Sequence, residues 1–288
     1  MQTVLVTGAS GALGQAVVAR LKNNTEYQIV TAGRVAGNGN VRLDLRRLPE
    51  VEAALAQIQP DLVMHLAATF SGDFAEAYAI NVAASQCMLD VVEKAAKPAR
   101  VLLVGSAAEY GVVQPEENPV REHRLLGPVT VYGLTKAWQT QLAGMYAQRG
   151  VDVVVARVFN LDGPGMAERL FVGRLQKQIS EVVSGTRREI EIGSLLATRD
   201  YLSTDNAAAQ IMAIAKHGES GQVYHVASGI PVTMRDLLTR HLAANQLDFS
   251  IVRESAGSST HTGYDVPVIY ADVSRTMELM KREACGQS

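Results

Sequence analysis

The sequence has little of what several classes of protein require. Its two cysteines, Cys87 and Cys285, are too few for a disulfide framework or a paired zinc site. Its 27 basic and 29 acidic residues leave a net charge of −2, and no lysine-rich run is present that could neutralise a nucleic-acid backbone. No stretch of about 18 apolar residues is available to cross a membrane, and the start, MQTVLVTGAS, does not resemble a signal peptide. We therefore expect a cytoplasmic protein without nucleic-acid or membrane partners.

The composition is otherwise that of a folded protein, since 47% of the 288 residues are hydrophobic and 19% are charged. The histidines show no paired metal spacing, so we predict no metal site. The length fits one or two domains.

Short β-rich runs alternate with helical patterns over the first 160 residues. This rhythm is typical of an α/β fold, a doubly wound parallel sheet with helices on both faces. The expected strands are Thr3–Thr7, Gln28–Thr31, Val41–Leu45, Asp61–His65, Arg100–Gly105 and Val151–Val158, and the expected helices are Leu13–Lys22, Glu50–Gln57, Phe74–Lys97 and Val131–Gln148.

The rhythm changes after Asn160, where Leu161-Asp162-Gly163-Pro164-Gly165 breaks the pattern. We predict a smaller, discontinuous second lobe over 161–288, mainly for substrate, with some segments returning to the first domain at 1–160. A cleft between the two parts is the natural site for ligands.

A glycine-rich loop follows the first strand and opens the first helix. It consists of Gly8, Ser10, Gly11, Ala12, Leu13 and Gly14, with Ala9 between the first two. Glycines let the backbone turn tightly and approach a pyrophosphate, whose charge is met by free amides at the helix N-terminus. The placement favours a dinucleotide and predicts a Rossmann-type fold.

Residues after the next strands indicate which dinucleotide binds. The second strand ends at Arg34, where NAD-binding folds usually carry a carboxylate. A guanidinium can pair with a 2′-phosphate, so NADP(H) is favoured, although a solvated surface arginine is the simpler alternative. Asp44, followed by Leu45, can accept from the adenine amino group or merely cap a turn. The run Leu66-Ala67-Ala68, after the core histidine His65, ends its strand with small residues that would let the cofactor lie close to the backbone.

Three residues point to carbonyl chemistry. Tyr132 and Lys136 lie four apart on an expected helix, so the ammonium can lower the pKa of the phenol and also reach the nicotinamide ribose. The spacing alone occurs by chance in many helices. Ser106, however, ends the fifth strand and faces the same crevice as the glycine loop. The set predicts hydride transfer to a carbonyl carbon, with Tyr132 protonating the oxygen and Ser106 holding it.

With these motifs, and with Arg157-Val158-Phe159-Asn160 and Arg199-Asp200-Tyr201, the sequence resembles the extended short-chain dehydrogenase/reductase family, which acts on nucleotide sugars. The stretches SAAEYG, FNLDGPG, TRDYLSTDNAAA and YHVASG are similar to the branch that reduces GDP-4-keto-6-deoxymannose with NADPH to a GDP-6-deoxyhexose such as GDP-rhamnose.

The resemblance implies further roles. Asn160 and Arg199 would hold the substrate diphosphate, unless they are a loop cap and a surface arginine. Ala107 would line the substrate site beside Ser106, and Asp265 would bind ribose hydroxyls. A homodimer would form through the helices Phe74–Lys97 and Val131–Gln148.

Departures from the family pattern narrow the reaction. Dehydratase relatives carry an acidic residue and epimerising synthases a cysteine where this chain has Ala108, so simple reduction is favoured. Two alternatives remain: a nucleotide-sugar 4-epimerase with tightly bound NAD, and a catalytically silent dinucleotide-binding regulatory protein.

Overall fold

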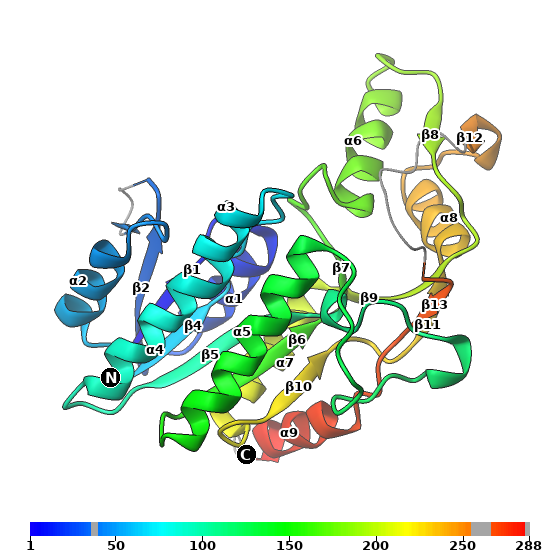
Figure 1. The fold of residues 1–288 in the computed structure, drawn as a ribbon. Helices are drawn as coiled ribbons and strands as arrows, with labels where there is room; N and C mark the ends of the chain where they lie inside the picture. Colours follow the sequence, from blue (N-terminus) through cyan, green and yellow to red (C-terminus); the bar gives the residue numbers. More distant parts are fainter. Residues whose placement is uncertain (36–39, 255–265, 286–288) are drawn as a thin grey trace.

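The computed structural model describes residues 1–35, 40–254 and 266–285 (Figure 1). Its larger part is a seven-stranded parallel sheet in the order β10-β6-β5-β4-β1-β2-β3. The strands are β1 (Gln2–Thr7), β2 (Tyr27–Gly33), β3 (Asn40–Arg42), β4 (Leu62–His65), β5 (Arg100–Ser106), β6 (Val153–Val158) and β10 (Val223–Val226). The chain winds outward in one direction from β1 to β3 and in the other from β4 to β10. This confirms the predicted doubly wound, Rossmann-like α/β fold.

Helices cover both faces of this sheet. One face carries α1 (Ala12–Lys22), α7 (Thr204–His217) and α9 (Ser274–Cys285), and the other carries α2 (Leu48–Ile58), α4 (Ala84–Lys94) and α5 (Val131–Gln148). In Figure 1, α4 and α5 lie in front of the sheet and α7 lies behind it.

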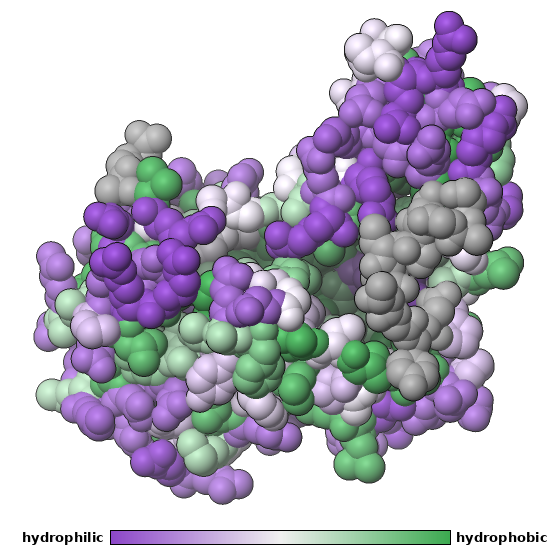
Figure 2. Space-filling view, turned by 45° about the horizontal axis from the view of Figure 1, so that its top comes forward, coloured by the Kyte–Doolittle hydropathy of each residue, from purple (hydrophilic) through white to green (hydrophobic). Residues whose placement is uncertain are grey.

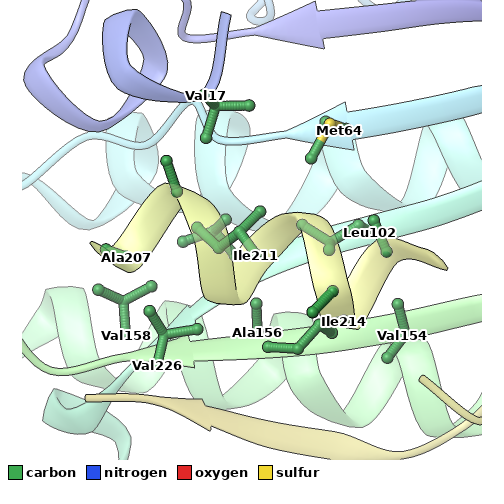
Figure 3. Packing of buried hydrophobic residues seen from close by; sticks show 14 of the residues in the cluster. Val17, Met64, Leu102, Val154, Ala156, Val158, Ala207, Ile211, Ile214 and Val226 are labelled. Carbon is green, nitrogen blue, oxygen red and sulfur yellow. The ribbon is translucent and has the colours of Figure 1, made fainter. Parts of the chain in front are cut away.

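The strands are apolar on both sides because both faces are buried. Leu102 packs into the cluster under α7, whereas its neighbour Leu103 points to the opposite face, as the period of two in a strand requires. Figure 3 shows Ile211 and Ile214 of α7 packed against Val154 and Ala156 of β6.

The smaller part stands to one side of this body (Figure 1). It has a four-stranded sheet and a two-stranded one, with its own apolar core between α6 and α8. Its elements are β7 (Asn160–Asp162), α6 (Phe171–Val183), β8 (Ile190–Ile192), β9 (Thr198–Ser203), β11 (Pro231–Thr233), α8 (Met234–Ala244), β12 (Val252–Glu254) and β13 (Val268–Ile269). Three segments after residue 160, α7, β10 and α9, pack in the larger part. We keep the division at residue 160 as a proposal.

The helix expected from Phe74 to Lys97 differs from the observed one. It is split into α3 (Phe74–Tyr78), a π-helical turn over Ala79–Ala83, and α4, which ends at Lys94. Its end comes early because Ala95 is extended, ahead of Pro98. Within the described ranges, no helix has both the length and the apolar character needed to cross a bilayer.

Candidate active site

The glycine turn between β1 and α1 is shaped for a close approach of backbone. Gly8 has a φ of +74°, and a Cβ there would lie 2.6 Å from the amide nitrogen of Ala67. A Cβ on Gly14 would lie 2.1 Å from the carbonyl oxygen of Gly8. The helix begins at Ala12 with Gly11 as its N-cap, and no described side chain caps its first turn. The amides of that turn are therefore free to bind an anion.

The remaining predicted cofactor residues surround this turn. Ser10 and Gly11 are exposed on it, and Leu13 is half-buried in the first turn of α1. Leu66, Ala67 and Ala68 follow β4 and are half-buried, and the amide of Leu66 donates to the carbonyl of Thr7 at 3.2 Å. The loops after β1 and β4 thus meet at the carboxyl edge of the sheet.

Arg34 lies exposed directly after β2. Asp44 and Leu45 lie beyond β3, which ends at Arg42, three residues earlier than expected. Asp44 caps its own turn, since Oδ1 accepts from the amide of Arg46 at 3.1 Å. The hydrogen bonds from Arg46 lower the pKa of the Asp44 carboxyl to about 2. The alternative of a turn cap is therefore realised, and a contact with adenine stays a prediction.

The catalytic candidates meet at the end of β5. Ser106 is the last residue of this strand and accepts from the amide of Ala108 through Oγ at 3.2 Å. Tyr132 stands in the first turn of α5, which Thr130 caps by accepting from Gly133 at 3.0 Å. Burial raises the pKa of Tyr132 to about 12, and the interaction with the Ser106 hydroxyl lowers it in part. Ser106 and Tyr132 therefore form one site with a protonated phenol.

One expectation about Lys136 is wrong. Its ammonium does not lower the pKa of Tyr132, because it hydrogen-bonds Oε1 of Gln139 one turn further along α5. Gln139 in turn donates to Oγ of Ser85 on α4 at 2.7 Å. Lys136 is 1% exposed, and burial lowers its own pKa to about 8. It stays close to the site but points along the helix.

Asn81 was not predicted from the sequence. It lies on the π-helical turn, fully buried, and its Nδ2 donates to Oγ1 of Thr135 at 2.9 Å and to the carbonyl of Thr69 at 3.0 Å. Its Oδ1 accepts from the amide of Thr69 at 2.9 Å. A π-turn often marks a functional position, but the apolar periodicity of the sequence does not reveal one.

Phe70 and Arg169 were also missed. The Phe70 ring stacks on that of Tyr132, with 4.1 Å between centroids and 19° between planes. Cζ of Arg169, from the segment before α6, lies 4.3 Å from the Phe70 centroid. Arg169 is exposed and also lowers the pKa of Tyr132 through its charge. A cation from the smaller part thus lies over the ring that stacks on Tyr132, and Figure 2 shows the surface hollowed between the two parts.

A buried ion pair supports the loop that carries Ser106. Glu109 is fully buried, and its Oε1 accepts from the amide of Ser106 at 2.7 Å. Its Oε2 lies 2.8 Å from Nη2 of Arg157, which is 2% exposed. Arg157 also donates to the Tyr110 hydroxyl at 2.7 Å, and that hydroxyl lies 2.5 Å from Nε2 of His225. The network links the end of β5 to β10.

The predicted substrate residues on the smaller part lie on its four-stranded sheet. Nδ2 of Asn160, on β7, donates to the carbonyl of Asp200 at 3.1 Å. Arg199, on the neighbouring β9, donates to the carbonyls of Thr198 and Val266. Both side chains are half-buried. Asp265 lies outside the described residues.

Comparison with known proteins identifies the family of this arrangement. The sequence pattern of the NAD dependent epimerase/dehydratase family matches residues 4–227, most of the chain. The chain belongs to this family. One curated relative in it, the GDP-6-deoxy-D-mannose reductase of Pseudomonas aeruginosa, is 27% identical over 263 residues and is aligned over 88% of this chain and 84% of its own.

A second relative is the GDP-6-deoxy-D-talose 4-dehydrogenase of Aggregatibacter actinomycetemcomitans, 24% identical over 96% of this chain and 90% of its own. The structure of RMD from Pseudomonas aeruginosa complexed with NADPH has a TM-score of 0.85 at 23% identity, over 98% of this chain and 93% of that one. The epimerase/dehydratase fold is therefore shared over nearly the whole chain.

The residues fit the dinucleotide that this epimerase/dehydratase family uses. The crowding at Gly8 and Gly14 and the uncapped start of α1 make a cradle for a pyrophosphate. Among the residues that the structure describes, no three His, Cys, Asp or Glu side chains gather where they could hold a metal ion.

Proposed function

We propose that the chain uses NADPH to reduce the 4-keto group of a nucleotide-linked 4-keto-6-deoxyhexose of the GDP-4-keto-6-deoxymannose type, giving a GDP-6-deoxyhexose such as GDP-rhamnose. The observation that carries this proposal is the meeting of Ser106 and Tyr132 at the carboxyl end of β5, with Lys136 one turn further along the same helix. Two relatives are named for their action on GDP-6-deoxyhexoses, and these names support the substrate class.

The side chains have complementary tasks in this reaction. NADPH, when bound at the glycine turn, supplies a hydride to the carbonyl carbon. The Tyr132 phenol, with a pKa of about 12, holds its proton at neutral pH and donates it to the developing alkoxide. The Ser106 hydroxyl donates to the same oxygen and stabilises its negative charge. Lys136, with a pKa of about 8, is mostly charged at neutral pH, and we assign it to the nicotinamide ribose, which requires its ammonium to turn away from Gln139.

Ala108 favours simple reduction over the more elaborate family reactions. It lies in the short helical turn Ala107–Tyr110 that follows Ser106. Its methyl side chain offers no acid or base for elimination of water or for deprotonation beside the ketone. Arg34 favours NADPH, since its exposed guanidinium follows β2, where a 2′-phosphate would lie. Purification with tightly bound NAD would instead support the 4-epimerase.

The diphosphate of the substrate would lie between the two parts. We assign it to Asn160, Arg199 and Arg169, and the ribose hydroxyls to Asp265. Arg169 joins this set because it is an exposed cation beside the catalytic tyrosine.

The test is to mix the protein with freshly made GDP-4-keto-6-deoxymannose and follow loss of NADPH absorbance, with NADH in parallel. We expect rapid loss with NADPH and a slower one with NADH. Tyr132→Phe should lower kcat by about 10² to 10⁴ while NADPH still binds. Full turnover by this variant would refute the mechanism. NADPH binding without reduction of any 4-keto sugar would instead support the alternative of a catalytically silent regulatory protein.

We also propose a homodimer through α3, α4 and α5. Phe74, Tyr78 and Met145 are 47%, 40% and 44% exposed on this face, and Trp138 contacts the first two edge-on. Figure 2 shows hydrophobic residues gathered on the front of the molecule, where these helices lie in Figure 1. Sedimentation should give a dimer for the wild type and a monomer for Met145→Glu.

A further inference from the structure

The Phe70 ring stacks on the ring of Tyr132, the candidate proton donor. Phe70 as a whole residue is 38% exposed. The guanidinium of Arg169, from the smaller part, lies over the same ring. Phe70 therefore lies between the two parts of the molecule, beside the proton donor.

Buried hydrogen bonds hold the backbone just before Phe70. Asn81 binds both the amide and the carbonyl of Thr69, the residue before Phe70. The same Asn81 amide donates to Thr135, whose hydroxyl donates to the carbonyl of Tyr132 at 2.9 Å. One buried side chain thus ties the segment that carries Phe70 to the helix that carries Tyr132, so the backbone that presents the ring is held in place.

The chemistry beside Tyr132 differs on the two sides of the reacting carbon. In the proposed substrate, C3 carries a hydroxyl, whereas C5 carries C6, a methyl group in a 6-deoxy sugar. A benzene ring offers a hydroxyl no good partner, so burying one against it is costly. A methyl group against the same ring gains free energy through burial.

We propose that Phe70 receives the C6 methyl group and is a specificity-determining residue that makes the enzyme select 6-deoxy over 6-hydroxy nucleotide sugars. This inference rests on the proposed function, since it concerns the sugar reduced at C4.

The test uses GDP-rhamnose and GDP-mannose, which differ only by the hydroxyl on C6. Each is oxidised at C4 with NADP⁺ at alkaline pH, so that the carbinol hydrogen leaves as hydride to the nicotinamide. The hydroxyl proton passes to the Tyr132 phenolate, which has first released its own proton to solvent. If the forward product has the talo configuration, the corresponding talose pair is used. The wild type should prefer the 6-deoxy sugar by about 100-fold in kcat/KM.

Phe70→Gln and Phe70→Leu form a matched pair of variants. Both lose the ring stacked on Tyr132, so any loss of turnover from a displaced tyrosine affects both sugars alike and cancels in the preference. Gln can hydrogen-bond the extra hydroxyl, and we expect the preference to fall by about tenfold or more. Leu keeps an apolar wall and should retain most of the preference.

Three results would overturn the inference. The first is an unchanged preference for the 6-deoxy sugar in Phe70→Gln. The second is an equal loss of this preference in Phe70→Gln and Phe70→Leu. A wild type that oxidises both sugars equally would remove the role of Phe70 but leave the proposed function intact. By contrast, failure to oxidise either sugar, together with a negative forward assay, would remove the proposed function itself.

Discussion

The backbone amide of Ser106 donates to the carboxylate of Glu109, three residues later, at 2.7 Å. The same carboxylate, fully buried, is paired with Arg157, 48 residues further along the chain. The loop that presents Ser106 is thus held by an ion pair that reaches across β5 to β6. Because both charges are buried, removing one partner of the pair leaves the other charge uncompensated, which costs much folding free energy.

Glu109→Gln should therefore lower the free energy of unfolding by about 3 kcal/mol, since it leaves the Arg157 guanidinium buried without a counterion. Urea unfolding measures the change. The control is Glu168→Gln, which removes the exposed pair with Lys177 and should not change stability measurably. Similar stabilities for the two variants would show that the buried pair does not hold the loop.

Much of the fold could be predicted from local sequence. The helix Val131–Gln148 was predicted with its observed ends, because Thr130 caps its start and a glycine follows its last turn. The candidate catalytic residues could also be singled out, since Ser106, Tyr132 and Lys136 each lie in a short recognisable pattern on a predicted element, and their roles stay a prediction.

Features that depend on distant contacts could not be predicted in this way. The stack of Phe70 on Tyr132 joins residues 62 positions apart, and nothing in either segment specifies it. The π-helical turn has more residues per turn than an α-helix, and Asn81 on it bonds to Thr69 and Thr135, which are distant in the sequence. Lys136 was assigned to Tyr132 from its spacing alone, whereas Gln139 competes for its ammonium.

The buried ring of His225 predicts a dependence of stability on pH. Burial lowers its pKa to about 3, although its Nδ1 lies 2.8 Å from the carbonyl of Asp272. The unfolded chain takes up a proton below about pH 6.5, whereas the folded one does not until about pH 3. The stabilisation is therefore complete above pH 6.5 and is lost as the pH falls.

We expect His225→Gln to reduce the slope of unfolding free energy against pH by about 1.4 kcal/mol per unit, measured between pH 4.5 and 6. The measurement needs constant ionic strength and an unchanged denaturant m-value in both proteins. A slope identical to that of the wild type would contradict the buried, neutral state of this histidine.

Asn81→Ala should weaken both the fold and the reaction. It removes the partners of the Thr69 backbone and of the Thr135 hydroxyl, for an expected loss of about 1–3 kcal/mol in unfolding free energy. It also frees Phe70, so kcat should fall more than the KM for NADPH rises. The comparison is Asn24→Ala, whose side chain accepts only from the amide of Glu26 at an exposed turn. Unchanged kcat in Asn81→Ala would show that Phe70 and Tyr132 keep their places without this amide.

Gly8→Ala should abolish cofactor binding through crowding as well as backbone strain. Gly8 and Gly185 have nearly the same φ, +74° and +76°, so alanine costs a similar strain of about 1–2 kcal/mol at each. A Cβ at Gly8 meets the backbone of Ala67 at 2.6 Å, whereas one at Gly185 meets nothing within 4 Å. The loops after β1 and β4 must therefore separate in Gly8→Ala, and the cradle for the pyrophosphate is lost with them.

We expect the Kd for NADPH, measured by titration calorimetry, to rise by at least about 100-fold in Gly8→Ala, or about 2.7 kcal/mol, and to stay unchanged in Gly185→Ala. Equal affinities in the two variants would place the dinucleotide away from the glycine turn.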